Sequence, residues 1–340
     1  MRESPDFVRT SLAASITLGL KRGRFYRNAK LYCINLLIHY DIGCSANCSY
    51  CGLQKLRAGR YDEKSFIRVD WPLYPTDEVI RRMEEREDEI ERVCISMITR
   101  RKAVQDTMEI ARRIKERTDI PISFLISPTV ILPGDLENFK KSGADKIGVA
   151  IDAATPELFD RHRGKGVKGP HKWDKYISVF KEAVSVFGKG NVGSHFIVGL
   201  GETEKEMVKA IQFIKDLGGE THLFSFFPEP GSLLENQNPP PIGTYRRIQI
   251  ARYLIDNEKA RFEDMKFNEK DQIIDFGIDI TPYIEQGECF MTSGCVGKKG
   301  RVACNRPYAN ERPGDNIRNY PFPPEPHDIE KIKKEIFLYE

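Results

Sequence analysis

The chain has 340 residues, of which 40% are hydrophobic and 30% charged, so its composition is that of a globular protein long enough to bury a full core. A formal net charge of only +3 excludes a nucleic-acid binder driven by overall charge. No apolar run reaches the roughly 18 residues that a membrane-spanning helix needs. The mildly apolar segment 11–20 is preceded by charges and followed by a basic stretch rather than a cleavage site, so we expect a cytoplasmic protein that binds neither membrane nor nucleic acid.

Six apolar segments rich in Ile, Val and Phe alternate with segments of helical periodicity. Thr155 before Pro156 predicts a helix start, and Thr203 with Glu206 predicts a capping box at the start of another helix. Such units of strand and helix predict parallel strands joined by right-handed crossovers, in either an open doubly wound sheet or a partial barrel. The expected strands are Tyr32–Tyr40, Val93–Ile98, Ile122–Ile126, Lys146–Ile151, Val192–Val198 and Thr221–Phe227.

The eight cysteines are the unusual feature of the composition. A chain of this length without a secretion signal does not need disulfides, and six of its cysteines fall into two triplets, which indicates metal binding. Cys33 and Cys94 lie outside the triplets, within expected strands, and are predicted to be buried core residues.

The first triplet, Cys44, Cys48 and Cys51, lies in the loop directly after the first expected strand. In a parallel α/β fold such loops line the functional face. Three thiolates can hold three corners of a [4Fe–4S] cluster and leave one iron open for a substrate or cofactor. A zinc site completed by a fourth ligand, or three unrelated buried cysteines, are the alternatives.

Residues 44–51 read CSANCSYC and resemble the signature of the radical S-adenosylmethionine (SAM) enzymes. The resemblance covers roughly residues 31–227. It implies a partial (β/α)6 TIM-like barrel and a [4Fe–4S] cluster on the three cysteines, whose open iron binds the amino and carboxylate groups of SAM. It also implies that Tyr50, just before the last cysteine, lies against the SAM adenine.

Two further segments are assigned to SAM binding by the same resemblance. In the segment 195–202, HFIVGLGE, Gly199 and Gly201 would let the backbone approach the flat adenine ring closely, although an ordinary turn between strand and helix is the alternative. The second expected strand ends in SMITRR, which departs from the family's Gly-Gly-Glu-like turn. Ser96 and Thr99 are the candidates there to contact the SAM amino group through oxygen atoms.

Two charged residues complete the expected SAM site. Asp152 follows the fourth expected strand and could bond the ribose hydroxyls, or it could simply form a turn. Arg163 lies in a basic, glycine-containing stretch at 161–168 that could meet the SAM carboxylate or the substrate. A solvated basic face is the alternative for this stretch.

The second triplet, Cys289, Cys295 and Cys304, lies in an irregular region rich in Gly, Pro, Asn and Arg. Such a region needs an external organiser, and a metal cluster would supply the missing folding energy. We expect a second [4Fe–4S] cluster, with free cysteines or zinc as alternatives and the fourth ligand left open. Arg306 and Arg312 could hydrogen-bond the cluster sulfides or bind an anionic group of the substrate.

The order of the two triplets, together with ACNRPY at 303–308, resembles the two-protein lipoyl synthase of archaea and some bacteria, within the biotin-synthase-like radical SAM proteins. The resemblance implies sulfur insertion at C6 or C8 of a protein-bound octanoyl chain. The sulfur would come from the auxiliary cluster, so Cys289, Cys295 and Cys304 would be catalytic. A radical SAM enzyme with a relay or substrate-binding cluster, which catalyses dehydrogenation or rearrangement, is the runner-up. A non-catalytic iron–sulfur carrier is the third possibility.

These expectations divide the chain into an N-terminal extension (1–30), a radical SAM barrel (31–280) and an auxiliary-cluster region (281–340). The partners implied are an octanoylated lipoyl domain or glycine-cleavage H protein, a paralogous second subunit and a ferredoxin-like electron donor. The basic segment 21–27 could dock an acidic lipoyl domain, or it could be only a charged helix end.

Overall fold

The computed structural model describes residues 2–306, 314 and 316–339. Its main element is an eight-stranded sheet with the order β3-β1-β2-β4-β5-β6-β7-β8. Six neighbouring strands of this sheet, in the order β2-β4-β5-β6-β7-β8, pair in parallel, and each coincides with one of the six expected strands. They are β2 (Cys33–Ile38), β4 (Arg92–Ser96), β5 (Ile122–Ile126), β6 (Ala144–Asp152), β7 (Val192–Val198) and β8 (Glu220–Ser225).

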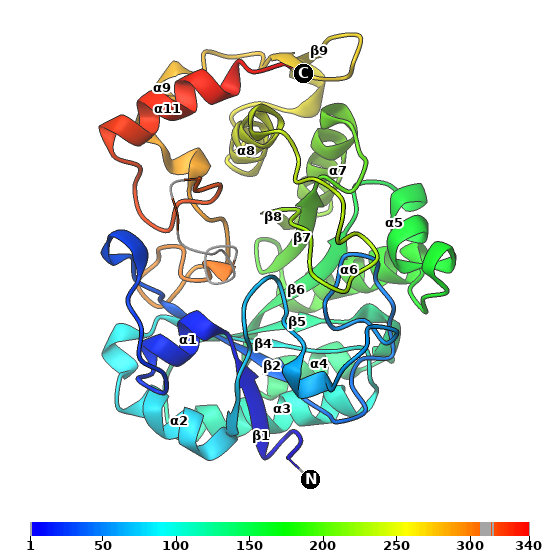
Figure 1. The fold of residues 1–340 in the computed structure, drawn as a ribbon, viewed down its shortest axis with the longest axis vertical. Coiled ribbons are helices and arrows are strands. Elements are labelled where there is room, and N and C mark those ends of the chain that lie inside the picture. The colour runs from blue at the N-terminus through cyan, green and yellow to red at the C-terminus, as the bar shows by residue number, and fades with distance from the viewer. Residues whose placement is uncertain (1, 307–313, 315, 340) are drawn as a thin grey trace.

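Helices cover the outer face of this curved sheet (Figure 1). Every residue of β2, β4 and β5 is buried, as expected for parallel strands packed on both faces. Among the described strands, β8 pairs only with β7 and β3 only with β1, so the sheet is not closed. The predicted α/β class with a partial barrel is therefore confirmed. The covering helices are α2 (Thr76–Glu84), α3 (Lys102–Lys115), α4 (Asp135–Lys141), α5 (Pro156–Arg163), α6 (Trp173–Phe187) and α7 (Glu204–Asp216).

Local sequence accounts for the helix starts. The Thr203 side chain accepts a hydrogen bond from the Glu206 backbone N–H at 3.2 Å, and the Glu206 carboxylate accepts one from Thr203 N–H at 2.8 Å. This is the predicted capping box, and it opens α7. Thr155 likewise caps α5, with Pro156 at the first helical position.

The N-terminal segment, which was expected as an extension, contributes a strand to the sheet. Strand β1 (Phe7–Thr10) pairs antiparallel with both β2 and β3 (Leu73–Pro75), and helix α1 (Leu12–Thr17) follows it. These strands have four and three residues, too few for the alternation of apolar and polar residues to reveal them in the sequence.

The chain after β8 returns across the open side of the barrel (Figure 1, orange to red). The Ser293 hydroxyl accepts a hydrogen bond from Leu223 N–H of β8 at 3.2 Å, and the Val296 carbonyl accepts one from Arg92 of β4 at 2.7 Å. The segment therefore spans from the last strand to the first parallel pair. Its elements are α8 (Ile242–Asp256), the hairpin β9 (Lys266–Phe267) and β10 (Ile273–Asp275), α9 (Thr281–Gln286), and α11 (Pro326–Ile336).

Within the part of the chain that the structure describes, no helix is long and apolar enough to cross a membrane.

Candidate active site

The first cysteine triplet lies in the loop after β2, at the carboxyl end of the parallel strands. The Cys44 sulfur accepts a hydrogen bond from Ala46 N–H at 3.4 Å, and the Cys51 sulfur accepts one from Leu53 N–H at 3.4 Å. Burial raises the pKa of the Cys48 and Cys51 thiols, and the neighbouring cysteines raise it further. Cys48 and Cys51 therefore lie in surroundings that favour neutral thiols until a metal displaces their protons.

Tyr50, Asp152 and Arg163 form one network beside this loop. The Tyr50 hydroxyl donates a hydrogen bond to the Asp152 carboxylate, and Arg163 lies 3.3 Å from the same carboxylate. Arg163 also donates to the Ile151 carbonyl at 2.8 Å and to the Tyr176 hydroxyl at 3.1 Å. The structure thus brings the three predicted residues together, but it places Arg163 behind Asp152, where it holds the end of β6.

The predicted glycine turn follows β7. Gly199 and Gly201 have φ angles of 107° and 111°, which side-chain-bearing residues rarely adopt. The Glu202 carboxylate closes the turn by accepting hydrogen bonds from Gly199 N–H at 2.6 Å and Leu200 N–H at 3.0 Å. Burial raises the pKa of Glu202 to about 7.

His162 joins the cysteine loop to the glycine turn, and the sequence analysis missed it. Its Nδ1 lies 2.8 Å from the Ser49 hydroxyl, and its Nε2 lies 2.9 Å from the Leu200 carbonyl. Its own carbonyl accepts from Ser49 N–H at 2.9 Å. The only signal in the sequence was a histidine in the basic stretch, which reads equally well as an exposed charge.

Ser96 and Thr99 lie at different depths. The Thr99 carbonyl accepts a hydrogen bond from Ser45 N–H at 3.2 Å, so Thr99 borders the cysteine loop. Ser96 ends β4, and its hydroxyl accepts a hydrogen bond from the buried Arg306 guanidinium at 2.7 Å. The structure therefore places Thr99 at the expected SAM site and Ser96 deeper in the barrel.

An internal chamber of about 120 Å³ opens beneath the cysteine loop. Tyr50, Cys51 and Asp152 line one part of it, and Arg306 lines another. His195 also lines it, and burial holds the pKa of this imidazole well below its usual range, so it is neutral. The apolar part of its wall consists of Phe66, Ile67, Leu125, Ala150, Ile197, Phe224, Phe226 and Phe227, and Arg68, Ser225 and Glu229 complete the lining.

The second cysteine set differs from the predicted triplet. Cys295 and Cys304 pack against Cys33 and Cys94 in a small cluster separate from the main core. Cys289 packs in the main core instead, with its sulfur 3.5 Å from the Tyr283 carbonyl. The structure therefore separates Cys289 from its expected partners, because a one-turn helix at 288–290 carries it toward α8 and α9.

Cys33 and Cys94 are buried as predicted, with side chains 0% and 5% exposed. Their grouping with Cys295 and Cys304 was missed, because more than 200 residues of chain separate the two pairs. Arg306 donates a hydrogen bond to the Cys94 sulfur at 3.3 Å. It therefore lies between this cysteine group and the chamber, in agreement with its predicted place beside the second site. Tyr308 and Arg312 lie outside the described residues.

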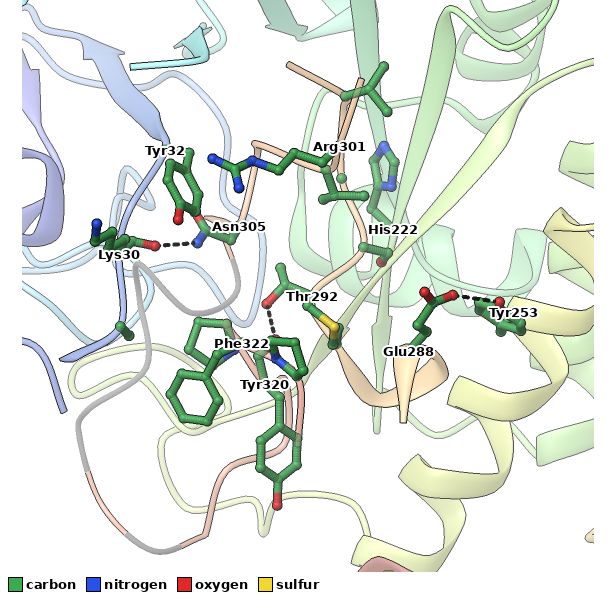
Figure 2. A pocket seen from close by; sticks show the side chains of 18 of the residues that line it. Lys30, Tyr32, His222, Tyr253, Glu288, Thr292, Arg301, Asn305, Tyr320 and Phe322 are labelled. Carbon is green, nitrogen blue, oxygen red and sulfur yellow. Dashed lines mark hydrogen bonds between the residues drawn. The ribbon is translucent and has the colours of Figure 1, made fainter. Parts of the chain in front are cut away.

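A second, wider cavity of about 790 Å³ lies on the open side of the barrel (Figure 2). Lys30 and Tyr32 line it before β2, His222 lines it on β8, and Tyr253 lines it on α8. The neighbours of the cysteines also line it, namely Gly294, Val296 and Asn305. The cysteine group of the C-terminal segment thus adjoins this cavity as well as the chamber.

Within residues 2–306 and 316–339, no group of three or more His, Cys, Asp or Glu side chains already stands in the geometry of a bound metal ion. This holds equally for the cysteines of the 44–51 loop.

Solved structures share the architecture. The FeFe-hydrogenase maturase HydG from Carboxydothermus hydrogenoformans has 14% identity and a TM-score of 0.52 over 87% of this chain and 75% of HydG. SuiB from Streptococcus suis has 14% identity and a TM-score of 0.49 over 67% of this chain and 47% of SuiB. At this level of identity the first likeness concerns the fold alone. No curated protein matches the chain.

The sequence itself decides the family. The model of the radical SAM superfamily matches residues 42–214, which is more than half of the chain. The matched segment begins just before Cys44 and runs through the glycine turn into α7, so it contains the cysteine loop, the Tyr50–Asp152–Arg163 network and His162. The chain belongs to the radical SAM superfamily.

Proposed function

We propose that this radical SAM enzyme inserts sulfur into an unactivated C–H bond of a protein-bound octanoyl chain, at C6 or C8, in the formation of a lipoyl group. The observation that carries the proposal is the apolar chamber between two cysteine groups. Cys51 lines it from the loop of the radical SAM signature, and Arg306, which is hydrogen-bonded to Cys94, lines it from the second group.

The cofactors supply the reactive chemistry. As a member of its family the protein uses a [4Fe–4S] cluster and SAM, which together provide hydrogen abstraction, and in this proposal an auxiliary cluster provides the sulfur atom. Cys44, Cys48 and Cys51 would hold the first cluster. Their chemistry fits it, since three free cysteines of one short loop can ligate three irons and leave the fourth open.

The protein's own residues position the substrate and keep water away from it. Phe224, Phe226 and Ile197 offer an alkyl chain an apolar surface without a competing hydrogen-bond donor. The neutral imidazole of His195 adds no charge to these walls. Cys51 and Asp152 bring the SAM side of the barrel to this chamber, and Arg306 brings the second cysteine group to it, which suits a reaction that takes hydrogen with one centre and delivers sulfur from the other.

The proposed partners follow from this substrate. They are an octanoylated lipoyl domain or H protein, a paralogous subunit that acts on the other carbon, and a ferredoxin-like donor of the electron for SAM cleavage. The basic segment 21–27 is the proposed docking surface for an acidic lipoyl domain, because Lys21, Arg22 and Arg24 are exposed. Arg27 of the same segment is instead paired with Asp328 at 2.9 Å.

The test is a product assay under anaerobic conditions. The reconstituted protein is incubated with SAM, a reductant and an octanoylated lipoyl-domain peptide, alone and with the paralogue. We expect 5′-deoxyadenosine together with a peptide that has gained sulfur mass. A peptide that loses two hydrogens, or keeps its mass while 5′-deoxyadenosine accumulates, would contradict sulfur insertion. Absence of 5′-deoxyadenosine would indicate an iron–sulfur carrier.

A matched variant probes the chamber. Phe224→Asp places a carboxylate in the apolar wall and should lower sulfur incorporation at least tenfold, because an alkyl chain cannot compensate the buried charge. Phe213→Asp, an exposed phenylalanine on α7, is the control and should leave incorporation unchanged. Equal effects of the two substitutions would argue against the chamber as the substrate site.

A further inference from the structure

We infer that Cys33, Cys94, Cys295 and Cys304 together form the ligand set of the auxiliary iron–sulfur cluster, and that Cys289 is not a ligand. The inference rests on the proposed function only in expecting an auxiliary cluster, and it holds whatever the substrate is. The triplet Cys289, Cys295 and Cys304 was chosen by its spacing in the sequence. The four cysteines proposed here as ligands are chosen by their position in the fold.

The first two cysteines come from neighbouring parallel strands. In the register of β2 and β4, Cys33 pairs with Arg92 and Asn35 pairs with Cys94. Since side chains alternate between the faces of a strand, Cys33 and Cys94 point to the same face, one step apart along it. That face also carries Ser96, so it is the one that looks into the barrel.

The other two cysteines come from one tight loop. The Cys295 carbonyl accepts hydrogen bonds from Ala303 N–H at 3.0 Å and Cys304 N–H at 3.1 Å, which brings both cysteines to the neck of the loop. A Cβ atom on Gly294 would lie 1.8 Å from the Cys304 carbonyl oxygen, so this close approach requires glycine.

The loop is fastened where β2 and β4 begin. The Arg92 guanidinium donates to the Val296 carbonyl at 2.7 Å, and Arg301 forms an ion pair with the buried Glu91 at 2.5 Å. Lys298 N–H donates to the Glu91 carbonyl at 3.2 Å. These contacts hold Cys295 and Cys304 over the two strand cysteines.

The four sulfurs are close to one another. The side chains of Cys33, Cys94, Cys295 and Cys304 pack together in one small buried cluster with Leu125. All four cysteines are free and buried. Four thiolates are the usual complement of a [4Fe–4S] cluster.

Buried cations surround these sulfurs. The Arg306 guanidinium donates a hydrogen bond to the Cys94 sulfur at 3.3 Å, and the Arg92 guanidinium donates to the Val296 carbonyl beside Cys295 at 2.7 Å. Each of these side chains is less than 9% exposed. Neutral thiols in a core would not need such neighbours, whereas an anionic cluster held by four thiolates does.

The position favours iron and sulfide over zinc. A structural zinc site holds its ion with four protein ligands and exchanges neither sulfur nor electrons. The four-cysteine group instead adjoins the chamber through Arg306 and the wide cavity through Gly294, Val296 and Asn305 (Figure 2). A centre that exchanges sulfur or electrons needs this access, and the wide cavity provides it without crossing the SAM site.

The test measures iron and sulfide rather than activity. In a background of Cys44→Ala, Cys48→Ala and Cys51→Ala, the anaerobically reconstituted chain should retain about four irons and four sulfides and an electron paramagnetic resonance signal on reduction. Adding Cys33→Ala with Cys94→Ala should remove at least three quarters of the iron and the signal. Adding Cys289→Ala, the matched control, should remove neither.

Three results would overturn the inference. They are full iron content in the variant lacking Cys33 and Cys94, loss of the cluster in the Cys289 variant, and zinc in place of iron and sulfide. To separate ligand loss from misfolding, Cys33→Ser with Cys94→Ser is made in the otherwise intact chain. It should lose about half of the iron and keep the rest on the first cluster, whereas loss of all iron would point to misfolding of the barrel and contradict a local ligand role. If the iron pattern holds and the peptide gains no sulfur, only the proposed function fails.

Discussion

Glu202 illustrates how a single side chain supports the site from behind. Its carboxylate receives two backbone N–H groups of the glycine turn, and it is buried enough that its pKa rises from 4.5 to about 7. Desolvation therefore outweighs the two hydrogen bonds, each of which favours the charged form. The turn is held by a group that takes up a proton when the chain folds.

The stability of the protein should therefore depend on pH through Glu202. Between pH 4.5 and about 7 the folded chain keeps a proton that the unfolded chain releases, so the free energy of unfolding falls as the pH rises. Relative to Glu202→Gln, the wild type should lose about 3 kcal/mol across this range. Urea unfolding of both proteins at several pH values measures the difference, and a difference that does not vary with pH would contradict the assignment.

Helix α5 acts as a connecting element between two parts of the SAM site. It begins at a threonine cap and ends beside His162, whose ring contacts Ser49 in the cysteine loop and Leu200 in the glycine turn. Burial lowers the pKa of His162, so the ring is neutral and donates from one nitrogen only. One histidine thus fixes the distance between the cluster loop and the turn predicted to contact adenine.

Replacing His162 should weaken SAM binding more than it weakens the fold. His162→Leu removes both contacts and should raise the dissociation constant for SAM about tenfold, the size expected from about 1.4 kcal/mol of lost hydrogen bonding. Equilibrium dialysis with SAM measures it, and urea unfolding reports the stability. His162→Gln, which keeps a donor and an acceptor, should recover part of the affinity. If both variants bind SAM like the wild type, the ring does not position the site.

Among the helices and strands, those whose buried residues follow a simple pattern along the chain could be predicted from the sequence. All six parallel strands were predictable because they are continuous apolar runs, and α7 was predictable from its cap. Helix α8 was not predictable, because it buries Arg246, Arg247 and Gln249 as well as apolar residues. Polar residues therefore occupy core positions in this helix. The Cys44–Cys51 loop could be singled out because its three cysteines are local in sequence. His162 and the four-cysteine group depend on tertiary contacts that no local pattern contains.

At the scale of the whole molecule, Arg247 ties the barrel to the C-terminal segment. Its side chain is fully buried and forms an ion pair with Glu204 of α7 at 2.5 Å. It also donates to the carbonyls of Ile336 at 2.7 Å and Leu338 at 3.0 Å. The residue therefore links α7, α8 and the end of α11 through one guanidinium.

Removal of this guanidinium should be costly. Arg247→Met leaves Glu204 charged and buried without its partner and should lower the free energy of unfolding by about 3–5 kcal/mol. Combining it with Glu204→Met should restore most of the loss, because no unpaired charge remains. Arg261→Met, which breaks the exposed pair with Asp216, is the control and should change little. Chemical denaturation measures all four proteins, and an Arg247→Met variant as stable as the control would refute the role.

The C-terminal loop over the first strands has a consequence for biosynthesis. Arg306 and Cys94 are in contact although 212 positions separate them in the chain. During translation the cysteines at 44–51 emerge early, whereas Cys295 and Cys304 leave the ribosome only after the whole barrel has been made. Contacts between such distant segments form late, since closing so long a loop is entropically unfavourable. The barrel must therefore persist for a time with its open side uncovered, so the 44–51 loop is accessible to cell machinery that delivers iron and sulfur before the four-cysteine group is complete.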